Sequence, residues 1–507
     1  MDSERLLFNP ELIKPDDQQY QPLLQNLQGN ILKGHGRRFT RQIFMIFKEK
    51  KQSQIKQAIA DLAQESTQQN WWEDIRVTSA MNQQRQAELR STIENSLFCN
   101  FFLSAKGYEF LGIEPPEDSS FHIGMAESLQ WPSYVSPSVI KKLNQGSKAT
   151  KQAVHDSFKK GKMAKGHRNE VFSQEIHAMI LLANNDQTLL DAAEQQLKSL
   201  YSKLVSLFHV ESGKTISAPE NSPYGKSVEH FGYSDGISNP LFYQKDYDKA
   251  LQKEHPPAFD QYDPRASLTL VLVKDPHGGE AAYGSYLVFQ KLEQNVEEFS
   301  KQITNLANAL NIGEELAEAF VMGRFKDGTP VVESSRSGMS SPRNNFSYYQ
   351  NETDHDNAGM RCPLHAHIRK VNPRRGRYRD NRIVRRGITY DDRQQPDDKT
   401  PPHKNVGILF MCFQSDIGNQ YETLVKDWAF DGTPRAESGT DPILSFNSDS
   451  HYDQNSSEAQ SWPERWGGMK PLHKKLRFPF EQVIKNLGGE YFFAPSLSFL
   501  RKLPNLH

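Results

Sequence analysis

The sequence predicts an α+β fold built from two similar modules of about 200 residues each. Both halves of the 507-residue chain contain apolar runs of strand length beside longer amphipathic helices. These elements follow the order strand, helix, strand with hairpins, and they lack the regular alternation that a doubly wound parallel sheet requires. We therefore expect antiparallel sheets covered by helices, with an N-terminal arm over residues 1–25, one module over 26–260 and a second over 261–507.

The first module is expected to contain four strands and two helices. Apolar runs predict strands at 42–47, 97–103, 175–182 and 205–210. Ser104 is placed to cap a short helix that ends near Leu111, and Asn185 or Asp186 is placed to cap a longer one. The expected apolar face of the longer helix consists of Leu189, Ala192, Leu197, Leu200 and Leu204.

A second set of elements begins near residue 267. Strands are predicted at 267–273, 285–289, 406–413 and 488–493. A helix is predicted where apolar residues step by three or four positions, at Val296, Phe299, Ile303, Leu306 and Leu310. Ser415 is placed to cap a further helix with Ile417, Tyr421, Leu424 and Trp428 on one face.

Composition excludes several classes of protein. The 61 Lys+Arg and 62 Asp+Glu leave a net charge of −1, which argues against a surface built for nucleic acid or anionic membrane. No run approaches the ~20 apolar residues that span a bilayer, and no secretory signal is visible at the start. Three scattered cysteines, Cys99, Cys362 and Cys412, are too few for a disulfide framework. We expect a cytoplasmic globular protein.

The segment FGYSDGISNP at 231–240 presents one carboxylate on a tight turn. Two glycines flank Asp235, and Asn239-Pro240 closes the segment, so the chain must turn sharply there. An ordinary turn in which Asp235 caps a helix is the alternative interpretation.

The segment RCPLHAHIRK at 361–370 combines histidines with cations. His365 and His367 stand two residues apart and would share one face of a strand. Residues 361–386 hold ten Lys or Arg and one acid, Asp380. Apolar residues interrupt this run, which indicates that part of it faces an anionic group inside the protein.

The segment NRIVRRGITY at 381–390 predicts a strand that carries a buried arginine. Alternation places Ile383 and Arg385 on one face and Val384 and Arg386 on the other. A buried guanidinium keeps its proton, so it needs a counter-charge or an anionic ligand.

Together, a positioned Asp, a His and an inward Arg indicate a haem site. A neutral imidazole can be the fifth ligand of haem iron, and the haem propionates attract Arg or Lys. On the opposite face of the haem, a proton shuttle and a cation are the groups that split a peroxide O–O bond.

Six motifs resemble the signatures of dye-decolorizing peroxidases, in the order of that family and over residues 25 to 503. They are QGNILKGHGR at 28–37, GYSDGISNP at 232–240, GRFKDGTP at 323–330, AHIRK at 366–370 with NPR after it, RIVRRG at 382–387 and GGEYFFAPSLSFL at 488–500. The long insertions and the basic second segment resemble the larger, advanced members. The resemblance implies two ferredoxin-like modules with haem b held mainly by the C-terminal one, and a haem peroxidase that reduces hydrogen peroxide and oxidises bulky aromatic compounds such as anthraquinone dyes and phenols.

The resemblance also implies roles for individual residues. Asp235 matches the distal acid/base and Arg385 the arginine that stabilises charge in O–O cleavage, with Arg386 as the alternative. His367 matches the proximal iron ligand. The other residues expected to contact the cofactor are Gly236, Ile237, Ser238, Arg369, Ile408 and Phe410. The proximal histidine needs an acidic partner, for which Asp416 and Glu422 are the candidates, and the role of His365 stays open.

Bulky dyes cannot reach a buried haem, so a surface Trp or Tyr would relay electrons to it. Tyr378, Trp428, Trp462 and Trp466 are candidates, each with ordinary packing as the alternative.

Two rival functions use the same segments. His365 and His367 could serve a metal-dependent hydrolase, and the basic run at 361–386 could bind haem or nucleic acid without catalysis. The net charge disfavours nucleic acid, and no second ligand cluster supports a metal site. The expected partners are hydrogen peroxide and aromatic reductants, with no nucleic acid or membrane, in a monomer or homodimer.

Overall fold

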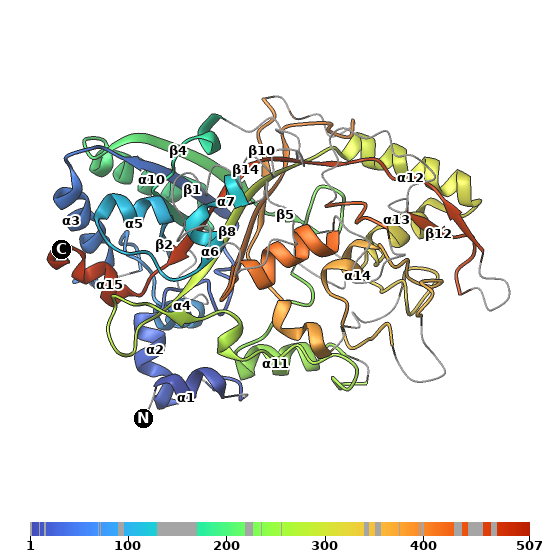
Figure 1. Ribbon diagram of the computed structural model, residues 1–507, viewed down its shortest axis with the longest axis horizontal. Coiled ribbons are helices and arrows are strands. Elements are labelled where there is room, and N and C mark those ends of the chain that lie inside the picture. The colour runs from blue at the N-terminus through green and yellow to red at the C-terminus, as the bar shows by residue number, and fades with distance from the viewer. Residues whose placement is uncertain are drawn as a thin grey trace, which may run out of the picture.

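One antiparallel sheet runs through both halves of the chain in this computed structural model (Figure 1). The structure describes residues 3–9, 11–14, 17–68, 70, 72–89, 96–128, 170–218, 227–234, 236–254, 256–338, 344–349, 356–374, 376–394, 396, 400–429, 439–444, 460–467 and 474–506. The strand order is β10-β11-β8-β14-β2-β3-β1-β4, while β7 pairs with β8 and β9 pairs with β11.

The strands of this sheet match the predicted runs in most places. They are β1 (Phe39–Phe47), β2 (Phe98–Leu103), β3 (Ala178–Asn184), β4 (Val205–Lys214), β7 (Val273–Lys274), β8 (Tyr283–Gln294), β9 (Val384–Arg385), β10 (Ile388–Asp391), β11 (Val406–Gln414) and β14 (Ile484–Ala494). Two small hairpins lie outside it, β5 (Ile216–Ser217) with β6 (Ser227–Val228) and β12 (Ser461–Pro463) with β13 (Lys475–Arg477).

The two halves of the sheet repeat one strand order. Strands β4-β1-β3-β2 of the first half and β14-β8-β11-β10 of the second half both follow the order fourth, first, third, second along the chain. This is the antiparallel order of the ferredoxin-like β-α-β-β-α-β unit. The prediction of an α+β fold made of two similar modules is therefore confirmed, although no sequence repeat revealed it.

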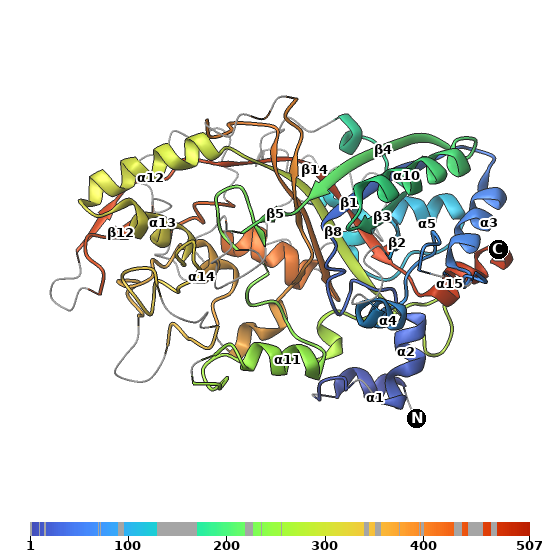
Figure 2. The same ribbon diagram turned by 180° about the vertical axis from the view of Figure 1, so that it is seen from behind.

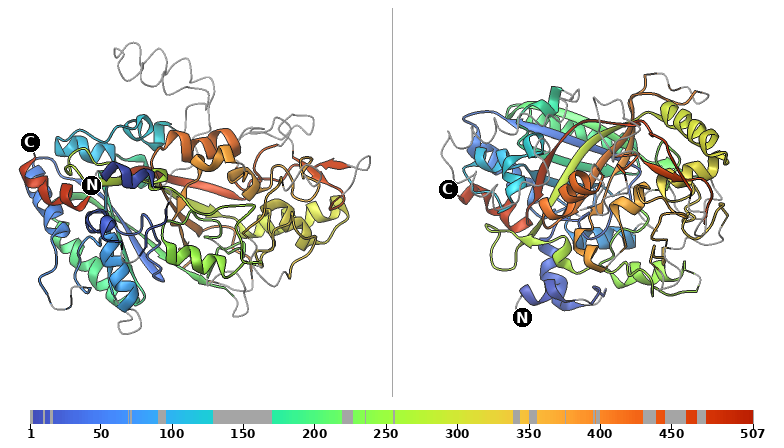
Figure 3. Two further views of the ribbon diagram at one scale, coloured as in Figure 1. Left: turned by 90° about the horizontal axis from the view of Figure 1, so that it is seen from below. Right: turned by 45° about the vertical axis from the view of Figure 1, so that its right-hand side comes forward.

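Helices α3, α5 and α15 (Leu497–Lys502) lie at one end of the molecule and α12 and α13 at the other, as the views from the front and from behind show, and the remaining helices lie between these ends (Figures 1, 2 and 3). The first half carries α2 (Gln21–Asn26), α3 (Gln52–Ala63), α4 (Ala80–Leu89), α5 (Ala105–Leu111), α6 (Ser119–Ile123), α7 (Met125–Ser128) and α10 (Gln187–Tyr201). The second half carries α11 (Gln244–Leu251), α12 (Val296–Leu310), α13 (Glu314–Met322), α14 (His367–Val371) and the π-helix η5 (Gly418–Ala429).

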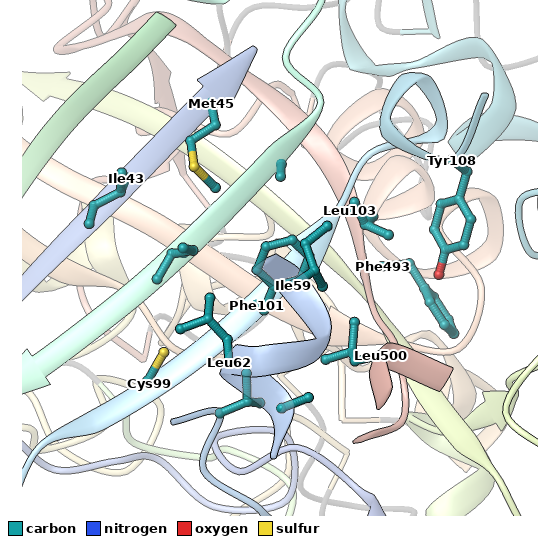
Figure 4. Close-up of a cluster of buried hydrophobic side chains, with 14 of the residues drawn as sticks. Ile43, Met45, Ile59, Leu62, Cys99, Phe101, Leu103, Tyr108, Phe493 and Leu500 are labelled. Atoms are coloured by element: carbon teal, nitrogen blue, oxygen red, sulfur yellow. The ribbon is translucent and has the colours of Figure 1, made fainter. Parts of the chain in front are cut away.

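Alternation along the strands divides the core of the first half between two faces. Ile43 and Met45 point into a cluster covered by α3, whereas Phe44 between them points into a second cluster on the other face. Figure 4 shows the first cluster, where Ile59 and Leu62 of α3 meet Phe101 and Leu500. Side chains that alternate between the faces of a strand explain this division.

The end of the chain returns to the first half. Strand β14 joins the two half-sheets through the pair Phe493 and Leu103, and α15 (Leu497–Lys502) packs beside α3. The N-terminal segment, with α1 (Ser3–Phe8), is also packed, because Ile13 and Tyr20 are almost fully buried and Ile13 bridges to Tyr243. The described part of the predicted N-terminal arm is therefore packed against the rest of the protein at these residues. The division of the chain at residues 25 and 260 stays a prediction.

Three predicted elements differ in detail. Residues 267–273 form a 3-10 turn at Leu268–Leu270 followed by β7, and not one strand. The buried residues of α10 are Leu190, Ala193, Leu197 and Tyr201. Leu197 was predicted, whereas the other three each follow a predicted residue by one position, and Leu189 and Leu200 are exposed. Residues 418–429 form a π-helix that Asp416, and not Ser415, caps at Asn419. Among the described residues, no helix has the length and apolar composition that crossing a bilayer requires.

Candidate active site

A mostly apolar cavity lies in the second half, between the sheet and the helices α13, α14 and η5. Its volume is about 250 Å³, whereas one water needs only about 10–15 Å³ of such space, so it can hold part of a large ligand. Loop 231–240, strands β8, β9 and β11, and the three helices all contribute to its wall. The site residues that the sequence predicted and that line it are Ile237, Ser238, His367, Arg385, Ile408 and Phe410.

His367 is fixed by a buried carboxylate. It is the first residue of α14, and its Nδ1 lies 2.9 Å from Oδ2 of Asp441, which is fully buried. The other oxygen of Asp441 accepts the backbone N–H groups of Ile443 and Leu444 at 2.8 and 3.0 Å. Because a carboxylate on Nδ1 holds the proton there, Nε2 of His367 keeps its lone pair and can ligate a metal ion.

The acidic partner of His367 is therefore neither residue that we expected. Glu422 accepts hydrogen bonds from Ser120 and Tyr491 and pairs with Lys426 at 2.9 Å, so it joins η5 to the first half. Asp416 caps η5. Asp441 stands 74 residues after His367, and no local pattern marks it.

The motif GRFKDGTP supports the helix that begins with His367. Gly323 ends α13 with φ +95°, and a Cβ there would lie 2.5 Å from Cγ1 of Ile368. Only glycine permits both this backbone conformation and this close approach of α13 to α14. Phe325 and Gly328 of the same motif line the cavity.

Arg385 reaches the cavity because of strand alternation. In β9 its backbone stands opposite Cys412 of β11. Ile383 and Arg385 both line the cavity, whereas Val384 is fully buried in the core between them. The Arg385 guanidinium donates to the carbonyl of Ile237 at 2.8 Å, so it meets the loop that carries Asp235.

Loop 231–240 turns as its glycines predicted. Gly232 and Gly236 have φ of +96° and +83°, and Ser238 also has a positive φ of +67°. The Glu229 carboxylate accepts the N–H groups of Phe231 and Tyr233 at 2.9 and 2.8 Å, which holds the first part of the loop. Asp235 itself lies outside the described residues, between Ser234, which lines the cavity, and Gly236.

Two arginines that the sequence did not single out give the cavity a cationic rim. Arg374 donates to the carbonyls of Asn344 and Phe346 and to the Ser238 hydroxyl, and burial lowers the pKa of Arg374. Arg382 donates to the carbonyls of Arg379 and Arg265. These acceptors are all neutral, and both arginines line the cavity. The sequence signal that pointed to Arg374 and Arg382 was their place in the basic run at 361–386.

Arg369 does not line the cavity. Its buried guanidinium pairs with Asp356 at 2.7 Å, also donates to the Cys362 carbonyl, and stacks on the ring of Tyr348. The expectation that it contacts a cofactor is therefore replaced by a structural role beneath α14.

A second chamber of about 370 Å³, lined by both polar and apolar groups, adjoins the cavity and shares Glu229, Arg385, Gly387 and Ile408 with it. Gly236 and Arg386 line this chamber and not the cavity. Arg386 donates to the carbonyls of Asn30 and Ile31 in the motif QGNILKGHGR. Of the two neighbouring arginines, only Arg385 thus reaches the cavity.

His365 and His367 do not form a pair of ligands on a strand. His365 is fully buried, and its ring packs edge-on against Trp462 with centroids 4.2 Å apart. In the described part of the chain, no three His, Cys, Asp or Glu residues gather as a metal-ion site would require.

The cavity thus combines a histidine held by an aspartate, a guanidinium, and two rim arginines whose hydrogen-bond acceptors in the described part of the chain are neutral. These are the groups by which an oxidoreductase of the peroxidase class ligates haem iron, cleaves peroxide and binds the haem carboxylates.

Known proteins share this architecture. The family described as "Dyp-type peroxidase, C-terminal" matches residues 227–449. The "Multifunctional dye peroxidase DyP2" of Amycolatopsis sp. is 32% identical over 95% of this chain and 96% of its own. The crystal structure of a DyP-type peroxidase from Anabaena sp. superimposes with a TM-score of 0.79 at 34% identity, over 99% of both chains. The structure of DyP2 gives a TM-score of 0.74 at 30% identity, over 95% of this chain and 96% of that one.

The chain therefore belongs to the dye-decolorizing (DyP-type) peroxidases, a family of haem enzymes, and it is a hydrogen-peroxide-dependent oxidoreductase.

Proposed function

We propose that the cavity holds one haem b and that the protein reduces hydrogen peroxide there while oxidising bulky aromatic compounds, such as anthraquinone dyes and phenols. The observation that carries this proposal is the set of charges around the cavity. His367 is backed by Asp441, and the hydrogen-bond acceptors of Arg374 and Arg382 among the described residues are neutral. A buried cation is stabilised by a counter-charge that neutral acceptors do not supply, so these arginines favour a ligand with carboxylates.

When bound, haem supplies an iron centre that exchanges electrons with peroxide and with the reductant. His367 would ligate the iron through Nε2, and Asp441 would hold the proton on Nδ1. Arg374 and Arg382 would bind the propionates. Asp235 would accept a proton from peroxide and return it to the departing oxygen, while Arg385 would stabilise the negative charge that develops there.

A visible spectrum tests the proposal. We expect the purified protein, supplied with haem, to bind one equivalent and to show a Soret band that changes when peroxide is added. Haem that binds without any response to peroxide would indicate a non-catalytic haem protein. Stoichiometric zinc without haem would favour the hydrolase. A cytoplasmic location and a monomeric or homodimeric state stay predictions.

Asp441→Asn tests the support of the proximal ligand. The amide keeps the size of the side chain but removes the negative charge beside Nδ1, so the imidazole becomes a weaker electron donor. We expect the reduction potential of the iron to become more positive and the rate of peroxide reduction to fall by about 10- to 100-fold. Spectroelectrochemistry measures the potential. Asp416→Asn, which changes a carboxylate that caps η5, is the control, and an unchanged potential in Asp441→Asn would contradict the role.

Tyr378 and Trp428 form the best-supported relay to the surface. Their ring centroids lie 5.1 Å apart, Trp428 is 6% exposed, and Tyr378 is half-buried. Trp428 belongs to η5, the helix that also contributes Tyr421 and Leu424 to the cavity wall. This arrangement supports the transfer of electrons from a dye at Tyr378 through Trp428 to the cavity.

The indole N–H groups of the other two relay candidates both bind backbone carbonyls, and Trp466 is half-buried. The indole N–H of Trp462 donates to the carbonyl of Phe478 at 2.9 Å, and that of Trp466 donates to the carbonyl of Val331 at 2.7 Å. Trp462 is fully buried, which favours ordinary packing for it.

Trp428→Phe should separate large substrates from small ones. Phenylalanine fills much of the same space but is harder to oxidise, so turnover of an anthraquinone dye should fall about tenfold, a barrier increase of about 1.4 kcal/mol. Turnover of a small phenol that enters the cavity should stay the same. Steady-state kinetics with both substrates measures this difference, with Trp72→Phe in the first half as the control. Equal losses for the dye and the phenol would argue against a relay.

A further inference from the structure

The strand that carries Arg385 has only two residues, and among the described strands it pairs with β11 alone. β9 pairs with β11, where Arg385 stands opposite Cys412, and the N–H of Arg386 donates to the carbonyl of Met411. The N–H and C=O of Arg385 itself face away from β11. Both bind Asn239, and the C=O also accepts a hydrogen bond from the Arg386 guanidinium at 2.8 Å. The position of Arg385 therefore depends on support from outside β11.

Asn239 supplies that support from the loop of Asp235. Its Oδ1 accepts the N–H of Arg385 at 3.2 Å, and its Nδ2 donates to the C=O of Arg385 at 3.3 Å. A side-chain amide offers one donor and one acceptor group, as a peptide unit does, so Asn239 takes the place of a missing neighbouring strand. Among uncharged side chains, only those of Asn and Gln carry an NH₂ donor and a C=O acceptor on the same carbon, as the peptide unit carries its N–H and C=O.

The same loop also holds the other end of Arg385. The guanidinium donates to the carbonyl of Ile237 at 2.8 Å, two residues before Asn239. Asn239 thus holds the backbone of Arg385, and Ile237 holds its side chain. Both residues belong to the loop that carries Asp235. The loop in turn is anchored at Ser238 by Arg374, whose guanidinium donates to the hydroxyl at 2.8 Å.

We infer that Asn239 is a positioning residue that fixes the orientation of Arg385 toward the cavity. This inference rests on the proposed function, because it assigns to Asn239 the alignment of an arginine that acts on peroxide. Asn239 does not line the cavity itself; it lies in the wall of the adjoining chamber, so it acts through Arg385.

Asn239→Ala should leave haem binding stoichiometric and slow the reaction with peroxide by about 10- to 100-fold, because misplacing a catalytic group by about 1 Å costs this much. Asn239→Asp keeps the acceptor for the Arg385 N–H and loses the donor, so we expect a smaller loss. Asn26→Ala is the matched control. Asn26 makes the same two-bond pairing, with Ser498 at 2.9 and 2.7 Å, far from the cavity in the first half.

A double-mutant cycle with Arg385→Ala distinguishes positioning from general loss of structure. If Asn239 acts through Arg385, adding Asn239→Ala to Arg385→Ala should change the peroxide rate less than twofold. An additional loss equal to that of the single variant would overturn the inference.

Two further readouts do not depend on turnover. Fluoride affinity of the ferric protein, titrated by absorbance, should fall about tenfold in Asn239→Ala, because a bound anion loses a hydrogen bond from Arg385. Amide hydrogen exchange of peptides covering 381–388 should become faster in Asn239→Ala, with or without haem, and stay unchanged in Asn26→Ala. Unchanged exchange and fluoride affinity in Asn239→Ala would overturn the inference. A wild-type protein that binds haem but ignores peroxide would overturn the proposed function alone, since these two readouts would still test the position of Arg385.

Discussion

Replacing Asp235 with Asn is expected to slow the reaction of the haem-loaded protein with hydrogen peroxide by about 10²- to 10⁴-fold, the range that general acid–base catalysis contributes. The amide has the size of the carboxylate but cannot take up a proton at neutral pH, so peroxide would have to lose its proton to water. Because loop 231–240 is held by contacts at Glu229, Ser238 and Asn239, the protein should still fold and bind haem.

Stopped-flow absorbance at the Soret band measures this rate as a function of peroxide concentration. Asp186→Asn is a suitable control, because Asp186 caps α10 in the first half and asparagine caps a helix equally well. A rate in Asp235→Asn within twofold of the wild type would rule out the proton-shuttle role.

Replacing Arg385 with Leu should lower the same rate by about 10²- to 10³-fold, as removal of a preorganised donor does at other sites where charge develops. Leucine keeps the apolar stem of the side chain, and the strand pairing with Cys412 involves only the backbone. The loss should appear in the bimolecular rate with peroxide, while the subsequent oxidation of a phenol should keep its rate.

The neighbouring Arg386 provides the contrast that decides between the two arginines of the motif. Arg386→Lys loses the hydrogen bonds of the guanidinium to the carbonyls of Asn30, Ile31 and Arg385, so we expect a lower melting temperature. Because Asn239 still binds the N–H and the C=O of Arg385, we expect a peroxide rate close to that of the wild type. If Arg386→Lys slowed the peroxide reaction as much as Arg385→Leu, the assignment of Arg385 would be wrong.

Elements with a local signal were predictable. The three-four spacing from Val296 to Leu310 marks α12, and Ser104 caps α5 through the N–H of Gly107 as expected. Spacing and caps are properties of neighbouring residues, so they survive in any tertiary context. The strand predicted at 267–273 was wrong, because an apolar run without alternation can be buried in several conformations. Here the run forms a 3-10 turn followed by a two-residue strand.

The partner of His367 shows where sequence reasoning stops. Asp416 and Glu422 lie closer to His367 in the sequence, and Glu422 is buried, yet its hydrogen bonds go to Ser120, Tyr491 and Lys426. Asp441 reaches Nδ1 of His367 because it lies beside the end of η5, where its N–H donates to the carbonyl of Ala429. The burial of a carboxylate and the choice of its partner depend on such long-range packing.

The sequence by itself determined the α+β class, the positions of most strands, and the residue types that point to haem chemistry. These follow from periodicity and from motifs whose residues are close together along the chain. Tertiary structure alone decided which cations face the cavity. Within residues 361–386 it turned Arg374, Arg382 and Arg385 toward the cavity, while Arg369 pairs with Asp356 and Arg386 lines the second chamber. The physical reason is that each buried guanidinium needs hydrogen-bond acceptors, and these acceptors come from segments far away in the sequence.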